Sequence, residues 1–248
     1  MDRQAQPPQG STFSALFDSY FAVVPATTVE LLEAAYALRY QVYCVEHPFE
    51  DPAKQVGHRE IDRYDAHSMH AVLISKRSGT VVGCVRLILP PVGGSEADLP
   101  IRGLLTDEWR ERLDRFQIDK TAEISRYAIA KMYRRREGES LYPDVQIDEI
   151  PSQDARRLVP HMSLGLLRGV ANLAAANGIT TVCAAMAPSL LRLVERFGLL
   201  FERLGEPIEY HGLRQPCVAE CGTLLAGLAD RIPEYYKVVA GESAPKTP

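Results

Sequence analysis

The sequence lacks the features that would place it at once in several broad classes of protein. Its 248 residues contain one tryptophan, and no apolar run reaches the ~18 residues from which a membrane-spanning helix is predicted. The N-terminal residues show no basic start followed by an apolar stretch, so we expect no secretory signal. The net charge of −4 lacks the basic excess that is typical of nucleic-acid-binding proteins. With 46% apolar and 24% charged residues, the composition is that of an ordinary globular protein with a sizeable core.

Cysteine is sparse and shows no metal-binding spacing. The five cysteines are odd in number, scattered, and mostly placed in apolar segments: Cys44, Cys84, Cys183, Cys217 and Cys221. No second Cys or His pair matches the spacing of the last two, which excludes an ordinary zinc motif. We therefore expect that the cysteines are free structural thiols and that the protein binds no metal. Free thiols indicate a reducing compartment, so we expect a cytoplasmic protein.

The hydrophobic pattern predicts alternating helices and strands. Thr27 and Glu30 form a capping box before a helix over 28–45, and Ser78-Gly79 joins the strands of a hairpin. The remaining expected elements are a short helix over 107–116, a strand over 122–130, a long loop over 131–157, a helix over 160–176, a buried strand over 179–186, a helix over 188–198, strands over 201–210 and 215–224, and a last helix over 225–236. This order indicates one mixed α/β domain around a central sheet. We expect a disordered leader over 1–16, a single domain over 17–238 and a disordered tail over 239–248.

Four short clusters carry charged residues that chemistry could use. They are Arg39-x-x-Val42-Tyr43, Glu60-Ile-Asp62-Arg-Tyr64-Asp65, Gly83-x-x-Arg86-Leu87 and Glu123-x-x-Arg126. Each is ordinary alone, since an arginine near a helix end or an acidic loop is usually a solvated group. Their order and spacing together form a pattern: R-x-x-V-[FY], D-x-[YF]-D, R-L on a strand, and E-x-x-R on a later strand.

This pattern resembles the acyl-homoserine-lactone synthases and, more closely, the N-acyl amino acid synthases and exosortase-associated acyltransferases. The resemblance runs from about Phe17 to about Leu224, and the segment from Glu209 to Val218 is similar to a late hairpin of the exosortase-associated group. It implies a GNAT-like (acyl-CoA N-acyltransferase) fold, with a mixed central sheet flanked by helices. It also implies transfer of a long-chain fatty acyl group from a thioester to the amine of a small acceptor, an amino acid first of all.

In such a fold two neighbouring parallel strands splay apart and the pantetheine arm of the donor enters the gap. Here these strands are 122–130 and 179–186, and backbone N–H groups near Tyr127, Ala128 and Ala130 are expected to bind the arm and polarise the carbonyl. The chain lacks the Gly-rich phosphate loop that usually follows the first of these strands. That departure favours acyl carrier protein over coenzyme A as donor, with no other cofactor. Arg134, Arg135 and Arg136 either dock this acidic partner or form a solvated loop.

The resemblance also assigns roles at the site. Direct transfer needs a base, acting directly or through water, and an oxyanion donor. Glu123 is the first candidate for the base or the relay to water and Glu60 is the second, while Arg126 is expected to hold either Glu123 or the acceptor. Strict alternation puts Glu123 and Arg126 on opposite faces, so their pairing requires a bulge in the strand. The residues expected either to bind substrate or only to lock the loop after the first helix are Arg39, Asp62, Asp65 and Arg86, with Tyr43 beside them.

An acyl chain also needs an apolar slot. Candidates on the helix 160–176 and strand 179–186 are Leu164, Leu167, Val170, Leu173, Ala174, Val182, Ala184 and Met186, although the same pattern fits core positions. Two other functions stay open: an acyl-homoserine-lactone synthase that uses S-adenosylmethionine, and a non-catalytic acyl-binding module. The first usually has a tryptophan shortly after the Arg39 position, whereas Trp109 lies far downstream. Loss of Glu123 or Arg126 would have favoured the second.

Overall fold

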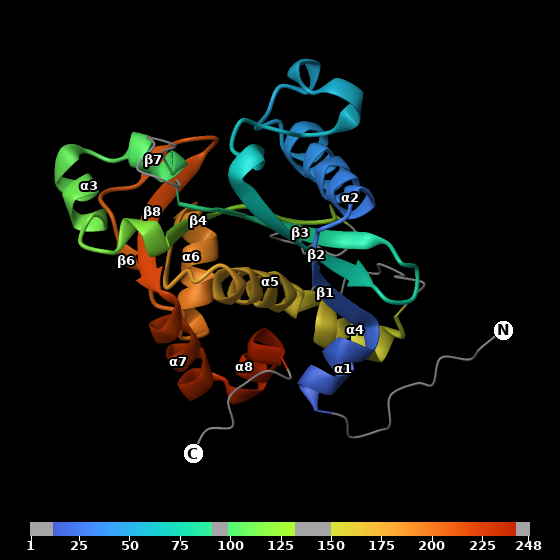
Figure 1. Ribbon diagram of the computed structural model, residues 1–248. Helices are drawn as coiled ribbons and strands as arrows, with labels where there is room; N and C mark the ends of the chain where they lie inside the picture. Colours follow the sequence, from blue (N-terminus) through green and yellow to red (C-terminus); the bar gives the residue numbers. More distant parts are fainter. Residues whose placement is uncertain (1–11, 91–98, 132–149, 242–248) are drawn as a thin grey trace.

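The computed structural model describes residues 12–90, 99–131 and 150–241, and a single mixed sheet forms its centre (Figure 1). The described strands lie in the order β1-β2-β3-β4-β5-β8-β6, and β7 pairs with β8. Only β4 and β5 run parallel, and the other described pairs are antiparallel. The strands are β1 Phe21–Pro25, β2 Ser68–Ser75, β3 Val81–Ile88, β4 Thr121–Ile129, β5 Thr181–Met186, β6 Glu202–Arg203, β7 Ile208–Glu209 and β8 Leu213–Glu220. The predicted α/β class with a mixed central sheet is therefore confirmed.

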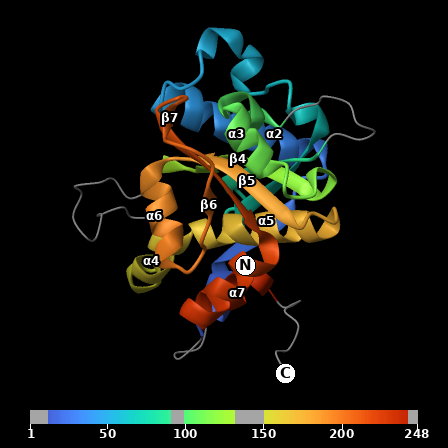
Figure 2. The ribbon, with the colours of Figure 1, turned by 90° about the vertical axis from the view of Figure 1, so that its left-hand side faces the viewer.

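Helices cover both faces of this sheet. They are α1 Phe13–Tyr20, α2 Val29–Tyr40, α3 Asp107–Leu113, α4 Ser152–Leu158, α5 Ser163–Ala176, α6 Pro188–Arg196, α7 Cys221–Arg231 and α8 Pro233–Ala240. Strand alternation decides the two faces: Ala71 and Leu73 of β2 join the core beneath α5, whereas Val72 between them joins the cluster beneath α2. Figures 1 and 2 show α2 on one side of the sheet and α5 on the other.

Two glycines let α5 lie directly on β2. A Cβ added at Gly165 would lie 2.8 Å from Leu73 Cδ1, and one at Gly169 would lie 2.7 Å from Ala71 Cβ. Since interiors are close-packed, larger residues there would push the helix off the sheet. The two glycines therefore set how closely α5 packs on β2.

The sheet is interrupted at two places in β4. Cys84 of β3 pairs with Ala128 while Arg86 pairs with Ser125, so Arg126 and Tyr127 together oppose a single residue of β3. Arg126 has a φ of 50°, which makes this a β-bulge with a left-handed residue. On the other side of β4, pairing with β5 covers only Thr121–Glu123 against Thr181–Cys183. Beyond these residues the two parallel strands part, as the resemblance implied, and the predicted bulge is confirmed.

The ends of the domain differ from the expectation. Phe13 and Leu16, assigned to a disordered leader, are buried in α1, because this helix lays an apolar face against the α5 side of the sheet. Strand β1 was not predicted, since five residues ending in proline give too short a pattern. At the other end, Val239 is buried in α8 although the tail was predicted from 239.

Three further segments need correction. The loop predicted over 131–157 contains α4 in its described part, from Ser152 to Leu158. The last predicted helix is two helices, which separate at Pro233 because proline cannot continue a helix. The long strand predicted over 201–210 is two short strands on either side of Gly205, whose φ is 95°.

Candidate active site

A cavity of about 320 Å³ lies where β4 and β5 separate. Its walls come from β4 after Ala122, β5 after Cys183, the start of α6, the π-helical turn Gln41–Glu46 that extends α2, and the hairpin β7–β8. Predicted site residues that line it are Tyr43, Asp62, Arg86, Glu123, Arg126, Tyr127 and Ala128. Arg39, Glu60 and Asp65 are not among the lining residues.

One side of the cavity is apolar. It is formed by Ile124, Leu167, Ala184, Met186, Leu190, Val194 and Phe201. Of the candidates for an acyl slot, Leu167, Ala184 and Met186 are lining residues, while Leu164, Val170, Leu173, Ala174 and Val182 belong to the main core. Leu167 is partly exposed, whereas the other four candidates on α5 are buried.

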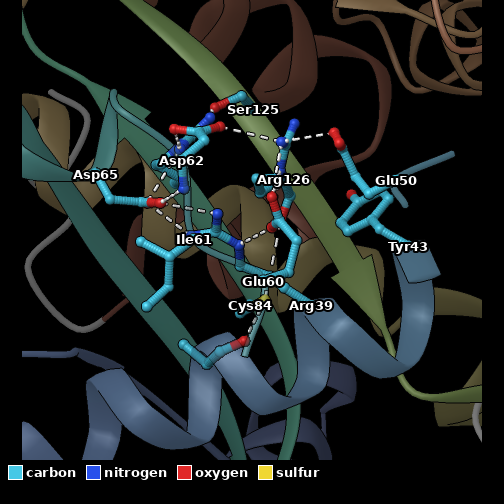
Figure 3. A network of polar contacts seen from close by, with 12 residues as sticks. Arg39, Tyr43, Glu50, Glu60, Ile61, Asp62, Asp65, Cys84, Ser125 and Arg126 are labelled. Atoms are coloured by element: carbon cyan, nitrogen blue, oxygen red, sulfur yellow. Dashed lines mark hydrogen bonds and ion pairs between the residues drawn. The ribbon is translucent and has the colours of Figure 1, made fainter. Parts of the chain in front are cut away.

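Behind the charged side of the cavity, Arg39 is fully buried and fully paired (Figure 3). Its Nε donates to Glu60 Oε2 at 2.6 Å, and its two terminal nitrogens donate to Asp65 at 2.7 and 3.0 Å. Glu60 has no exposed surface either. Both acids belong to the loop after α2, so Arg39 ties this loop to the end of its own helix, and it does not line the cavity.

Two other guanidiniums carry the network to the cavity. Arg86 Nη1 donates to Asp62 at 2.6 Å and to Asp65 at 3.0 Å, and its Nε donates to Ser125. Arg126 Nη2 donates to Glu60 at 2.8 Å, to Asp62 at 3.0 Å and to Glu50 at 3.0 Å. The network therefore joins three arginines (39, 86 and 126) to four carboxylates (50, 60, 62 and 65).

Ionisation inside this network follows from its pairing. Burial alone would raise the pKa of Asp65, but hydrogen bonds from Arg39 and the charges of Arg39 and Arg86 hold it well below its ordinary value. Burial, followed by the nearby charge of Arg39, lowers the pKa of His70 to about 4, so this imidazole is neutral near pH 7. The network keeps three positive and four negative charges, a net charge of −1.

Glu123 lies apart from these pairs. Its carboxylate accepts a hydrogen bond from the backbone N–H of Ile101 at 2.8 Å, and only 4% of the residue is exposed. Burial raises the pKa of Glu123 to about 8, against the opposing effects of that hydrogen bond and of Arg86. Near pH 7 this group is therefore mostly a neutral carboxylic acid.

The expected pair of Glu123 and Arg126 does not form. The bulge brings both residues to the same cavity, but Arg126 turns to Glu50, Glu60 and Asp62, and no hydrogen bond or ion pair joins it to Glu123 among the described residues. The expectation that Arg126 keeps Glu123 ionised is therefore wrong. The Arg126 guanidinium instead binds three carboxylates from the loop after α2. The sequence of β4 alone could not predict these contacts, because the loop is far away in the chain.

The backbone of β4 offers a donor to the gap. The N–H of Ala130 donates to Val82 of β3, so it is not available to a ligand. Because successive N–H groups of a strand point in opposite directions, that of Ile129 points to the side from which β5 has departed. Ile129 lines the cavity. At the end of β4, the N–H of Ile129 is therefore better placed than that of Ala130 to donate to a carbonyl oxygen in the gap.

Several residues at the cavity were not predicted as site residues. Glu50, Tyr210, His211 and Arg214 all line it, and they come from the loop after α2 and from the β7–β8 hairpin. Glu50 had no periodic signal, since it stands between Pro48 and Pro52 in an irregular loop. The hairpin was visible only in the resemblance of Glu209–Val218. Arg134, Arg135 and Arg136 lie outside the described residues.

The sequence profile of an acetyltransferase (GNAT) domain matches residues 38–143, which span β2, β3, β4 and the charged network. This protein has a GNAT-like fold. The match covers the residues that carry the splayed strand, but it ends before β5.

Solved structures with this GNAT-like fold are similar over most of the chain. The AHL synthase LasI superposes with a TM-score of 0.55 at 19% identity, covering 84% of this chain and 96% of LasI. FeeM, an N-acyl amino acid synthase from uncultured soil microbes, gives 0.56 at 13% identity over 85% and 96%. BjaI, a CoA-dependent acyl-homoserine lactone synthase, gives 0.53 at 20% identity over 86% and 89%. These identities establish the shared fold alone.

Two further results complete the comparison. No curated protein sequence matches the chain significantly. Within the described part of the chain, no helix combines the length and apolarity needed to cross a membrane.

Proposed function

We propose that this protein is an N-acyltransferase that moves a long-chain fatty acyl group from a carrier thioester to the amine of a small acceptor. The observation that carries the proposal is the cavity between β4 and β5, which is apolar along Leu167, Met186 and Phe201 and charged along Asp62, Arg86 and Arg126. A fatty chain requires the first surface, and a polar acceptor requires the second.

The chemistry needs an oxyanion donor and proton transfers. The N–H of Ile129 points into the gap and can donate to the thioester oxygen as it becomes negative. Glu123 and Arg126 remain our catalytic candidates. Because the pKa of Glu123 is raised to about 8, we assign it the role of a proton donor near neutral pH, in place of the base expected from the sequence.

An amino acid is our proposed acceptor. The carboxylates of Glu50 and Asp62, which line the cavity, favour a cationic ammonium group beside them. Arg214 lies beside it, stacked on Phe49 with 5.3 Å between the guanidinium carbon and the ring centroid. No carboxylate pairs with Arg214 among the described residues, and burial lowers its pKa, so an incoming carboxylate group would be stabilised there.

Acyl carrier protein is our proposed donor partner, with Arg134, Arg135 and Arg136 as its docking residues. The supporting observation is the missing Gly-rich phosphate loop after β4. Acyl-coenzyme A would use that loop, whereas an acidic carrier protein is attracted by arginines.

The test is a direct assay with matched donors. Purified protein is incubated with palmitoyl carrier protein or palmitoyl-coenzyme A and a mixture of the common amino acids, and released thiol and new amides are measured by absorbance and mass spectrometry. Lipid extracts of cells that overexpress the protein are analysed in parallel. A lactone that forms only with S-adenosylmethionine would replace this proposal with the alternative synthase, and the absence of any transfer would leave acyl binding alone.

A further inference from the structure

The tip of the β7–β8 hairpin brings a histidine to the cavity mouth. His211 Nδ1 lies 2.7 Å from the backbone oxygen of Phe49, which is 162 residues away in sequence. A carbonyl oxygen can only accept, so Nδ1 carries the hydrogen of the neutral ring. The other ring nitrogen, Nε2, therefore presents a lone pair.

This lone pair faces a carboxylate. Nε2 lies 4.0 Å from Glu50 Oε1, which is too far for a hydrogen bond, and neither atom has a hydrogen to give. Glu50 Oε1 is also held by Arg126 Nη2 at 3.0 Å, which fixes its position. Glu50 and His211 both line the cavity, with 23% and 37% of their side chains exposed. A donor with several hydrogens between them would satisfy both groups, and an ammonium has three.

The backbone of His211 has an unfavourable, left-handed conformation. Its φ is 51°, and Gly212 follows with a φ of 87°. A left-handed residue with a Cβ costs roughly 1–2 kcal/mol, which glycine would avoid. The hydrogen bond to Phe49 and the edge contact with Tyr210, at 4.7 Å between ring centroids, hold the imidazole in this strained place. Strain of this kind gathers at functional sites.

We propose that Glu50 and His211 form the acceptor ammonium site, in which Glu50 holds the cation and His211 Nε2 removes one of its protons. This assignment rests on the proposed acyl transfer. Loss of a proton to Nε2 frees the nitrogen lone pair, which attacks the thioester carbonyl and forms the C–N bond. When the C–S bond breaks, a second nitrogen proton goes to the leaving thiolate. The imidazolium then releases its proton to solvent, so the balance is amide, thiol and one proton.

The charged surroundings suit this role. The charged or titratable groups around the imidazole are Glu50 and Arg126 on one side and Tyr210 on its own hairpin. Arg214 and His47, which both contact the Phe49 ring, complete the set. Glu123, the other candidate base, is mostly protonated near pH 7 and is already bonded to Ile101. Of the two imidazoles that line the cavity, His47 and His211, it is His211 whose Nε2 lies beside Glu50.

The kinetic test uses two variants and a matched control. His211→Asn keeps a residue that tolerates a left-handed backbone and a side-chain donor for Phe49, but it removes Nε2. We expect kcat to fall by about 10²–10⁴, the acid limb of the pH profile to disappear, and the donor KM to stay constant. Glu50→Gln should raise the acceptor KM by about tenfold or more. His58→Asn is the control, because His58 has a φ of 56° but lies outside the cavity.

A second measurement does not depend on turnover. Protein labelled with ¹⁵N-histidine is titrated with propylammonium chloride, and with propanol and sodium chloride as controls, while the ring nitrogens of His211 are followed by NMR. We expect the free protein to show the Nδ1–H tautomer, and only propylammonium to shift Nε2, with the shift lost in Glu50→Gln.

The two measurements separate the failure of each proposal. If the wild-type protein transfers no acyl group yet propylammonium shifts His211, the transfer proposal fails and the ammonium site stands. If amides form but His211→Asn keeps the wild-type rate and pH profile, or if propylammonium leaves His211 unshifted, the site assignment is overturned.

Discussion

Arg39 and Asp65 form a buried bidentate ion pair, with Nη1–Oδ1 and Nη2–Oδ2 distances of 2.7 and 3.0 Å. The Arg39 side chain has no exposed surface, and its third contact, from Nε to Glu60, is equally buried. The residue that the family pattern places first is thus locked behind the site and does not line the cavity. This relationship changes what its removal should do.

Arg39→Ala should destabilise the protein more than it affects chemistry. Removal of Arg39 takes one cationic partner from each of two buried acids and leaves Glu60 with Arg126 and Asp65 with Arg86, at a cost of about 3–5 kcal/mol. Urea unfolding measures it. Arg59→Ala is the matched control, because Arg59 pairs with Glu33 at 2.9 Å but is 39% exposed, where such a pair contributes at most ~1 kcal/mol. A variant with the wild-type midpoint but no activity would instead indicate direct contact of Arg39 with substrate, as the sequence pattern first suggested.

Glu123 should make stability fall as the pH rises. Its folded pKa of about 8 lies above the ordinary glutamate value of about 4.3, so between these values the folded protein keeps a proton that the unfolded chain has lost. The stability due to this group is complete below about pH 4 and declines toward pH 8, by at most ~1.4 kcal/mol per pH unit. Glu123→Gln should remove this decline while keeping an acceptor for Ile101. Equal slopes for variant and wild type, from unfolding curves over this range, would contradict the raised pKa.

The same variant tests the proton-donor role. Glu123→Gln should lower kcat by about 10²–10³, since the developing oxyanion loses its acid, and should leave the donor KM nearly unchanged. The acid limb of the pH profile should persist, unlike in His211→Asn. Measuring kcat and melting temperature on one sample separates catalysis from stability, and normal turnover per folded molecule would remove Glu123 from the mechanism.

Leu167→Trp should shorten the acyl chain that the protein accepts. Leu167 faces the gap from α5 and lines the apolar side of the cavity, so a larger ring fills the space of several methylenes. We expect kcat/KM for a palmitoyl donor to fall by about tenfold or more while an octanoyl donor is little affected. Leu200→Trp is the control, because Leu200 is 64% exposed and outside the cavity. An equal loss for both donors would mean that the chain binds elsewhere.

Charge reversal of Arg134, Arg135 and Arg136 should weaken use of the carrier donor. Replacement by glutamate should raise the apparent KM for acyl carrier protein, most strongly at low salt, because long-range attraction between exposed charges is screened. Reversal of Arg156 and Arg157, exposed on α4, is the control. Equal efficiency with acyl-coenzyme A and the carrier in the wild-type protein would contradict the preference.

Local patterns in the sequence were enough to determine most elements and the class of fold. The capping box before α2, the turn at Ser78-Gly79 and the apolar run of β5 act over a few residues, and the structure contains all three elements. The family resemblance also grouped Arg39, Asp62, Asp65 and Arg86, and these four residues form one network. Arg126, which was expected to hold Glu123 or the acceptor, joins them through Asp62.

Only the tertiary structure decided what these residues face. Arg126 pairs with Glu50 and Glu60, which lie 76 and 66 residues away in sequence, and Glu123 is left alone with a raised pKa. Likewise, His211 reaches Phe49 across 162 residues. Ion pairing and desolvation act through space, so residues far apart in the chain compete for the Arg126 guanidinium. The sequence of β4 alone therefore does not determine which carboxylates bind it.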